Sequence, residues 1–567
     1  MKKSKIFGYI LVLVLLMSSN FVIPFLGMNG IYGNETNFST DTEHRFNTKQ
    51  VEDSLPQSNS NKKNDKQLIL DKKTSVFGQD LENYIAELSM QSKPISGQMK
   101  FIMMFREGIE KQTRLNYLDS IFTNYKLIYN YDVFSGVYVQ LDLYELVENY
   151  DTLKNEGLIS KIYKSKTFQT PIFGDNYLAA QPLNESAYEN WWLPAIGADN
   201  LEYDGSGVRV AVVDSGIYDA HPDLDLTLDF DFVANDSVGE DNNGHGTHVA
   251  GIIASSGASS GGKYVGVAPG VELINAKAGN STGSLESGNI INAIEWSAKP
   301  VADGGAGADI ISMSFGGGFP IAHEPLSAAI TAISREYDVI MVASAGNSGP
   351  DYFTGSSPAS GVSIISVGAT DKNNNLASFS SWGPTFTYLG YPDVAAPGVN
   401  IFSTLSKDSI IAKQELFVGD YADYADNGDY MPLSGTSMAC PMVSGALALI
   451  LSAYPEISVE TARIALMEGA NKLPENDDDD TVRSGIGLIN VKASLEFLEE
   501  KTDTDDVAKV FPDSLPIKPN TLLNFPGDKQ LFNLSIFTGK KSLSFDLDWS
   551  APAGIDIKTI TSDLSTT

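Results

Sequence analysis

Five short runs of apolar residues constrain the fold of this chain most strongly. They read VRVAVV, ELINAKA, DIISMSF, VIMVASA and VSIISVGA, and they lie between residues 208 and 369. Most of them are hydrophobic almost without interruption, which is typical of strands buried on both faces of a parallel sheet. Segments with helical spacing alternate with them, at His245–Ser255, Gly288–Lys299, Pro325–Glu336 and after Ser437. The pattern predicts a three-layer α/β domain in which helices cover a mainly parallel sheet.

The N-terminal region differs from this central part in composition. Lys2, Lys3 and Lys5 precede a long apolar run, which is typical of a secretory signal peptide, and we assign residues 1–30 to one. Because no clear cleavage site follows, an uncleaved membrane anchor is the alternative. We expect residues 31–95 to form a disordered or linker region. The protein should therefore be secreted and extracellular, either free or associated with the cell surface.

Residues 96–170 predict a small domain of their own. The segment Gln98–Lys166 shows strand, helix, strand, strand, helix and strand patterns in that order, which indicates a ferredoxin-like α+β unit. Residues 1–170 hold 20 Lys and Arg against 19 Asp and Glu, whereas the remainder holds 19 against 52. Because a body this acidic repels phosphate backbones, we expect no nucleic-acid partner.

Two further features bear on stability and on the C-terminal region. Cys440 is the only cysteine, which excludes an internal disulfide and leaves packing or bound ions to stabilise the chain. Residues 515–567 contain a hairpin pattern around Thr538–Lys540. We interpret them as a partial β segment that begins a β-sandwich or leans on the body, because two or three strands are too few to stand alone.

Four polar residues stand where a parallel sheet gathers its functional side chains, at strand ends and helix starts. Asp214 ends the run VRVAVV, and a carboxylate at the end of a buried strand is costly without a partner. His245 begins an Ala- and Ile-rich helix, and Asn347 follows the run VIMVASA after Gly346. Ser437 precedes a helix rich in Ala, Met and Leu, where it is either a nucleophile or only a helix cap.

Acyl transfer from a serine needs a hydroxyl, a base, an anion that orients the base, and donors for the developing oxyanion. Ser437, His245, Asp214 and Asn347 supply these in that order, and the backbone N–H of Ser437 can serve as a second oxyanion donor. We interpret His248 instead as a packed histidine. The presence of the other three residues favours a nucleophilic Ser437 over a cap.

The stretches DSGIYDAHPD, NGHGTHVAG, AGN and SGTSMACP, in this order, closely resemble the subtilisin-like serine peptidases. The resemblance covers roughly Trp191–Leu495, and we expect a catalytic domain over residues 185–500. It implies a secreted serine endopeptidase with an Asp, His and Ser triad and an oxyanion asparagine, the order and donor typical of that family. Residues 96–170 resemble the inhibitory propeptide of the same family. The resemblance thus implies a self-processed proenzyme that is cut between Lys166 and Trp191.

The resemblance also implies where the substrate binds. One segment should pair with the substrate backbone as an added strand, and two others should form the walls of the pocket for the residue before the cleaved bond. No acidic residue lies in these walls, which favours apolar substrate side chains. The implied substrate-binding residues are Gly283, Ser284 and Leu285 in the edge segment, and Ser314, Phe315, Gly316, Ala345 and Gly346 in the walls. Cys440-Pro441-Met442 departs from the usual Pro-His of the family, which we interpret as a packing change.

No metal or organic cofactor is expected in catalysis, while structural Ca²⁺ is an option. Asp223 matches a calcium-ligand position of the subtilisins, but the loop SGASSGGKY lacks the Asn or Asp that would complete that site. The expected partners are polypeptide substrates and the protein's own propeptide, with no stable membrane insertion and a monomeric state. Two alternatives are a catalytically inactive binding protein of the same fold, and a serine-carboxyl peptidase that uses Glu and Asp in place of His.

Overall fold

The computed structural model describes residues 75–170, 190–317, 325–361, 363–385, 391–413, 429–474 and 481–502. These residues belong to one compact unit that begins at Leu70. The predicted signal peptide and the predicted C-terminal β segment lie outside the described residues.

The N-terminal part of the described chain is a four-stranded antiparallel sheet in the order β2-β3-β1-β4. The predicted order of strands and helices over Gln98–Lys166 is confirmed, except that the second helix is divided in two. The elements are β1 Gln98–Phe105, α3 Lys111–Ile121, β2 Tyr125–Asn130, β3 Gly136–Asp142, α4 Leu143–Glu148, α5 Tyr150–Glu156 and β4 Ile159–Lys164. The fold is therefore the expected ferredoxin-like α+β arrangement.

A helix, α2 (Gln79–Met90), lies inside the stretch that we expected to be a linker. Leu81 and Ile85 are one turn apart and both are buried, so the helix has an apolar stripe that packs against β4. The linker prediction is therefore wrong for these residues. The polar composition of the stretch concealed this short amphipathic segment.

The larger part is built on a seven-stranded parallel sheet in the order β13-β12-β11-β10-β6-β8-β7. The five predicted strands are confirmed as β6 Arg209–Asp214, β8 Glu272–Lys277, β10 Ile310–Met313, β11 Ile340–Ser344 and β12 Ile364–Thr370. The sequence missed the two edge strands, β7 (Leu226–Asp231) and β13 (Val394–Pro397). Most of β7 is only half-buried, and β13 has four residues and ends in proline, so neither forms a long apolar run.

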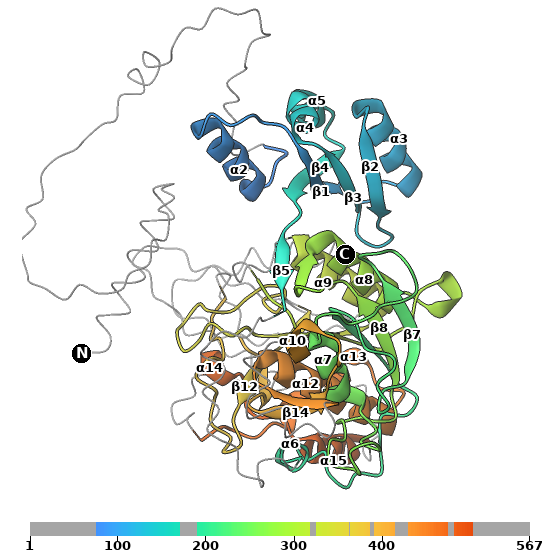
Figure 1. The fold of residues 1–567 in the computed structure, drawn as a ribbon, viewed down its shortest axis with the longest axis vertical. Coiled ribbons are helices and arrows are strands. Elements are labelled where there is room, and N and C mark those ends of the chain that lie inside the picture. The colour runs from blue at the N-terminus through green and yellow to red at the C-terminus, as the bar shows by residue number, and fades with distance from the viewer. Residues whose placement is uncertain are drawn as a thin grey trace, which may run out of the picture. The chain divides into compact units, whose positions relative to one another are not determined.

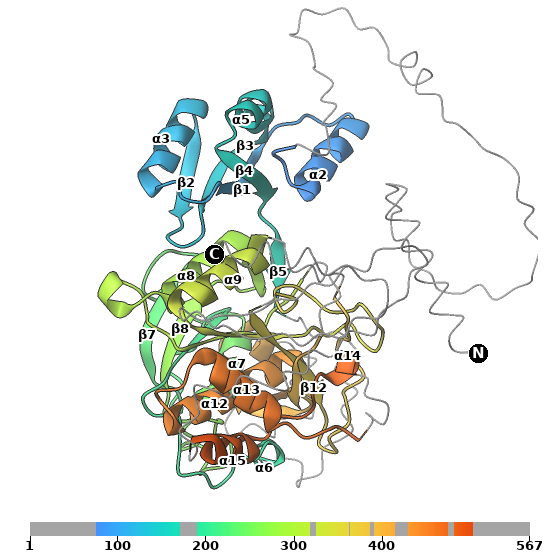
Figure 2. The ribbon, with the colours of Figure 1, turned by 180° about the vertical axis from the view of Figure 1, so that it is seen from behind.

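Helices cover both faces of this sheet. The side chains of Val210 and Val212 belong to one apolar cluster, whereas Ala211 and Val213 belong to another, as the two-residue period of a strand requires. α8 (Ser287–Ala298) and α9 (Pro325–Tyr337) pack on each other and belong to the second cluster. α7, α12, α13 and α15 belong to the first cluster. Figures 1 and 2 show α8 and α9 side by side, apart from these four helices. Their bounds are α7 His245–Ala254, α12 Thr436–Ala453, α13 Val459–Glu468 and α15 Val491–Thr502, so the three-layer prediction is confirmed.

Shorter elements complete the described chain. Two small antiparallel sheets pair β5 with β9 and β14 with β15. Among the described helices, α12 alone is long and apolar enough to cross a membrane, but 83% of it is buried inside the molecule, as expected of a core helix. The remaining elements are β5 Thr167–Gln169, α6 Trp192–Ala195, β9 Ser284–Glu286, η5 Val301–Asp303, β14 Ile401–Thr404, α10 Ile410–Lys413, β15 Tyr430–Leu433 and α14 Thr481–Ser484.

Candidate active site

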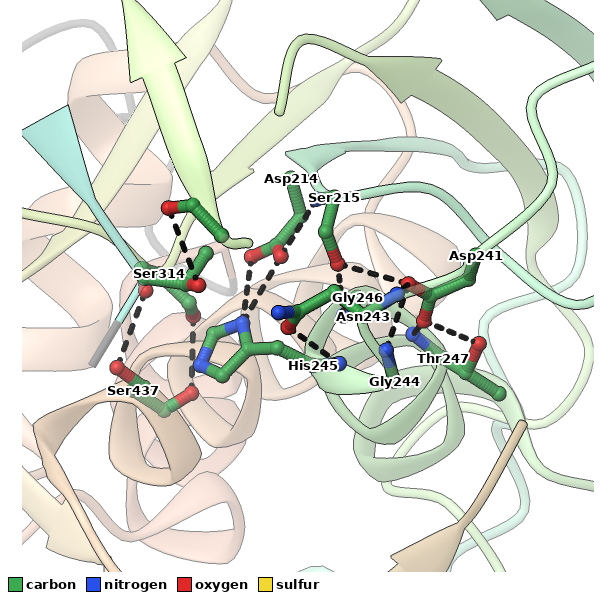
Figure 3. A network of polar contacts seen from close by, with 12 residues as sticks. Asp214, Ser215, Asp241, Asn243, Gly244, His245, Gly246, Thr247, Ser314 and Ser437 are labelled. Carbon is green, nitrogen blue, oxygen red and sulfur yellow. Dashed lines mark hydrogen bonds and ion pairs between the residues drawn. The ribbon is translucent and has the colours of Figure 1, made fainter. Parts of the chain in front are cut away.

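Asp214 and His245 form a buried pair at the carboxyl end of the sheet. Asp214 is the last residue of β6 and His245 is the first residue of α7. Nδ1 of His245 lies 2.9 and 3.0 Å from the two carboxylate oxygens of Asp214, and at most 1% of either side chain is exposed (Figure 3). The buried carboxylate of Asp214 therefore has the partner that it needs, which is the ring of His245. The carboxylate in turn fixes the proton of the neutral His245 ring on Nδ1.

Ser437 is the second residue of α12, and the N-cap of this helix is Gly435. Its hydroxyl does not cap the helix; it donates to the carbonyl oxygen of Ser314 at 3.0 Å. In return, Oγ of Ser314 donates to the carbonyl of Ser437 at 2.9 Å. That carbonyl is available because Pro441, four residues later, has no N–H to complete the helical hydrogen bond. Pro441 and Ser314 together hold the first turn of α12 against the end of β10.

The structure does not join His245 and Ser437 by a hydrogen bond. Nε2 of His245 is buried and has no hydrogen-bond partner among the described residues. In Figure 3 this edge of the ring is turned to the side on which Ser437 lies. The hydroxyl of Ser437, which is bonded to Ser314, is the candidate partner for Nε2, and hydrogen bonds in active sites often form only when substrate is bound.

Asn347 lies beside the start of α12. Its side-chain oxygen accepts hydrogen bonds from the backbone N–H and from the hydroxyl of Thr436, both at 2.9 Å. Thr436 also accepts from the N–H of Gly346 at 3.1 Å. Because the oxygen of the carboxamide is fixed by these two donors, the orientation of its NH₂ group relative to Ser437 is fixed as well.

The predicted edge segment is paired with a strand from the N-terminal part of the chain. β9 pairs antiparallel with β5, and the N–H of Thr170 donates to the carbonyl of Gly283 at 2.8 Å. On the other side of β5, Gln169 exchanges two hydrogen bonds of 3.2 Å with Gly316. Gly283 has a φ of +73°, and a side chain there would overlap the hydroxyl of Thr170. β5 thus lies between the predicted edge segment and the predicted wall segment that contains Gly316. This is the position in which the sequence analysis expected a substrate.

The two predicted pocket walls meet at a residue that the sequence did not single out, Ser356. A Cβ added to Gly316 would lie 2.5 Å from Oγ of Ser356, and one added to Gly346 would lie 3.0 Å from it. The same hydroxyl donates to the carbonyl of Ala345 at 3.3 Å. Ser356 lies in a Gly- and Ser-rich loop without periodicity, so nothing in the sequence marked it. The rings of Phe315 and Phe168 lie in a T-shaped arrangement with their centroids 6.3 Å apart.

The residues that depart from the family pattern are packed in the interior. Met442 is fully buried in an apolar cluster, as a packing change requires. Burial raises the pKa of the Cys440 thiol to about 11, so the thiol stays protonated at neutral pH. Nε2 of His248 lies 2.8 Å from the carbonyl of Met431, and burial lowers its pKa to about 3, which fits a packed histidine.

The surroundings of Asp223 do not fit a bound cation. Its carboxylate accepts hydrogen bonds from the N–H of Ser259 at 2.8 Å, from the hydroxyl of Ser256 at 3.3 Å and from the hydroxyl of Tyr430. Burial alone would raise the pKa of Asp223, but the hydrogen bonds from Tyr430 and Ser259, together with the nearby His221, outweigh it and the pKa is lowered. A calcium site needs oxygen ligands rather than donors. The described residues hold no group of three or more His, Cys, Asp and Glu side chains placed to bind a metal ion.

Comparison with known proteins agrees with this geometry. A family model described as the subtilase family matches residues 205–487. Serine protease AprX of Bacillus subtilis (strain 168) is 40% identical in an alignment of 304 positions that covers 51% of this chain and 66% of AprX. Subtilisin DY of Bacillus licheniformis is 38% identical over 309 residues, which are 54% of this chain and 97% of that protein.

A solved structure gives a related match. Fervidolysin from Fervidobacterium pennivorans, a keratinolytic enzyme related to subtilisin, aligns with a TM-score of 0.55 and 25% identity. The alignment covers 70% of this chain and 61% of fervidolysin. The chain therefore spans nearly all of subtilisin DY but just under two thirds of AprX and of fervidolysin.

Proposed function

We propose that this chain, which belongs to the subtilase family, is a secreted serine-type endopeptidase that is made as a proenzyme and uses Asp214, His245 and Ser437 as its catalytic triad. The triad proposal rests on the buried hydrogen bond between Asp214 and Nδ1 of His245. The other ring nitrogen, Nε2, is turned to the side on which Ser437 lies. The apolar, Lys-preceded N-terminus supports secretion.

Catalysis begins when the hydroxyl of Ser437 rotates from Ser314 to Nε2 of His245. His245 takes the proton while Oγ attacks the carbonyl carbon of the scissile peptide, and Asp214 stabilises the imidazolium that forms. The tetrahedral oxyanion receives hydrogen bonds from the N–H of Ser437 and the NH₂ of Asn347. His245 then protonates the leaving amine, and water releases the acyl group by the same steps in reverse. No cofactor enters this sequence.

The loss of the Asn347 amide should lower turnover by about 10² to 10³, the magnitude established for the oxyanion asparagine of a subtilisin. The binding of substrate should remain nearly unchanged, because that donor acts on charge that develops only in the transition state. The steady-state kinetics of Asn347→Ala on a peptide substrate measure both quantities.

The substrate backbone should bind as β5 does, as an added strand between β9 and Gly316. The edge residues are then Gly283, Ser284 and Leu285. The pocket for the residue before the cleaved bond lies between Ser314, Phe315 and Gly316 on one side and Ala345 and Gly346 on the other. Ser356 joins the two walls, and its small uncharged side chain agrees with a preference for apolar side chains.

The proenzyme proposal rests on contacts between residues 75–170 and α8. The carboxylate of Glu295 accepts the backbone N–H groups of Asp132, at 3.0 Å to each oxygen, and of Val133, at 2.9 Å. Glu295 is fully buried, and burial raises its pKa. The hydroxyl of Tyr131 donates to the carbonyl of Gly288 at 3.2 Å.

These contacts anchor a domain whose last described strand, β5, fills the proposed substrate site. Substrate cannot occupy that site while β5 is paired there, so residues 75–170 should inhibit the enzyme until they are removed. Because Thr170 is still paired with Gly283, cleavage should fall shortly after Thr170. This narrows the window between Lys166 and Trp191 that the sequence suggested.

The intact masses of purified wild-type protein and of Ser437→Ala after incubation at neutral pH test the proposal. The wild type should lose its N-terminal part shortly after Thr170, while Ser437→Ala stays full length. If both remain uncut although folded, an inactive binding protein becomes the better explanation. His245→Ala should also abolish cleavage at neutral pH; activity that persists in it would favour a serine-carboxyl mechanism.

A further inference from the structure

We propose that Asp241 is a positioning residue that holds Asp214 and His245 in register by joining the end of β6 to the first turn of α7. This inference rests on the proposed catalytic roles of those two residues. Asp241 has no hydrogen bond to the His245 ring, and it acts through hydrogen bonds to the hydroxyl of Ser215, next to Asp214, and to the backbone at the start of α7.

The first turn of α7 creates the need for such a residue. The first N–H groups of a helix have no partner within it, and a side chain at the N-cap normally satisfies one of them. The N-cap of α7 is Gly244, which has no side chain and a φ of 105°. Side chains from outside the helix must therefore satisfy the N–H groups of the first turn, which includes His245 itself.

Three different side chains share this task. Asn243 accepts the N–H of His245 at 3.3 Å. Ser215 accepts the N–H of Gly246 at 3.0 Å, and Asp241 accepts the N–H of Thr247 at 2.9 Å. The position of the His245 backbone thus depends on side chains that lie before the helix and at the end of β6.

The carboxylate of Asp241 stands at the centre of this arrangement (Figure 3). One oxygen accepts from the hydroxyl of Ser215 at 2.9 Å and from the N–H groups of Asn243 at 3.1 Å and Gly244 at 2.8 Å. The other accepts from the N–H and the hydroxyl of Thr247, at 2.9 and 2.6 Å. Five donors fill the acceptor capacity of a carboxylate, and only 3% of Asp241 is exposed.

Ser215 carries the connection to Asp214. Its hydroxyl donates to Asp241 and accepts from Gly246, so both of its hydrogen-bonding roles are used. Its backbone N–H donates to the carboxylate of Asp214 at 2.7 Å. A shift of Asp241 would therefore move the carboxylate of Asp214 and the start of α7 relative to each other.

Lys277, at the end of β8, reinforces the same connection. Its ammonium group donates to the carbonyl of Ser215 at 3.0 Å and to the carbonyl of Glu240, and only 5% of the residue is exposed. It therefore holds the residue after Asp214 and the residue before Asp241 together. A buried positive charge also offsets the two buried carboxylates nearby.

The substitution Asp241→Asn replaces one acceptor oxygen by an NH₂ group that faces donors, so the ring of hydrogen bonds cannot be kept. A misplacement of reacting groups by 1 Å costs about 10² in rate. We therefore expect kcat per active site to fall about 10- to 100-fold, while KM changes by less than about twofold because the substrate segments are not involved. The rate of self-cleavage should fall by the same factor.

Asp229→Asn is the matched control. Asp229 accepts from the N–H of Gly239 and from the side chain of Asn275 at 2.8 Å, so it supports the same loop without contact to Ser215 or α7. Each variant is expressed as the full chain and allowed to mature. Active sites are counted with a serine-directed organophosphorus titrant, and kinetics are measured on a chromogenic peptide. The control should keep the wild-type kcat per titrated site.

A second variant tests the route of the effect. Ser215→Ala removes the hydroxyl that links Asp241 to the end of β6, but it leaves the hydrogen bonds of Asp241 to the start of α7. It should also lower kcat per titrated site. The losses in Ser215→Ala and Asp241→Asn should not add in the double variant if both act through one connection. Ser215→Ala carries the test alone if Asp241→Asn does not accumulate as folded protein.

Two results would overturn the inference, and they are distinguishable. If Asp241→Asn lowers only the melting temperature and keeps the wild-type kcat per titrated site, Asp241 merely stabilises the fold. If the wild-type protein itself neither reacts with the titrant nor cleaves peptides, the proposed function fails and the positioning role fails with it.

Discussion

A buried histidine in the first turn of α7 makes the stability of this protein depend on pH. His248 is fully buried on α7, and burial lowers its pKa from the ordinary 6.5 to about 3. Between these two pH values the unfolded chain binds a proton at this residue and the folded chain does not. Protons therefore favour the unfolded state, and stability is lost as the pH falls below 6.5.

The size of this loss follows from the two pKa values. Each pH unit between about 6.5 and 3 changes the free energy of unfolding by about 1.4 kcal/mol. Between pH 7 and pH 5, His248 alone should therefore cost about 2 kcal/mol. His221, whose pKa burial also lowers, acts in the same direction.

The substitution His248→Gln, made in Ser437→Ala protein to prevent self-digestion, isolates this contribution. A buried glutamine will itself lower stability, but it has no proton to gain, so the comparison uses only the change between pH 7 and pH 5. Urea unfolding followed by circular dichroism should show that this change is about 2 kcal/mol smaller in His248→Gln than in its parent. If both proteins lose the same amount, His248 already carries a proton in the folded state, or is not buried, and the reasoning fails.

Two further substitutions test other parts of the structure. Gly288→Ala places a Cβ against the buried ring of Tyr138, so purified full-length protein should reach full activity with a shorter lag; an unchanged lag would mean that Gly288 does not determine how the N-terminal domain docks on α8. Tyr430→Phe removes a donor to the buried Asp223 and should lower the free energy of unfolding by about 1 to 3 kcal/mol, equally with calcium and with a chelator. Recovery of stability on addition of calcium would show instead that Asp223 lies at a cation site.

The central strands could be predicted because they are buried on both faces and carry unbroken apolar runs. The edge strand β13 could not, because it has only four residues and ends in proline, although it is fully buried. The edge strand β7 could not either, because most of it is only half-buried and the apolar pattern weakens. The same physics explains α2, whose few apolar residues face only the small sheet of the N-terminal domain. Sequence patterns report burial, so they are weakest where burial is partial.

The candidate site divides in a similar way. Asp214, His245, Asn347 and Ser437 could be proposed because each ends a strand or starts a helix within a short motif. Ser356 could not be found, because its place between two pocket walls depends on how distant loops pack. Hydrogen bonds between segments far apart in sequence have no periodicity, so they are absent from the signals that a single sequence provides.

The glycines on either side of His245 have a role that the sequence motif alone does not reveal. In the structure, a Cβ on Gly246 would overlap the carbonyl of Gly216, and one on Gly244 would meet Ser409. Gly246 therefore allows the end of β6 and the start of α7 to approach each other, which is the distance that Asp241 and Ser215 then fix, whereas Gly244 allows the segment of Ser409 to approach the helix start. A motif of this kind encodes the spacing of two backbone segments, and the geometry of Asp214 and His245 follows from that spacing.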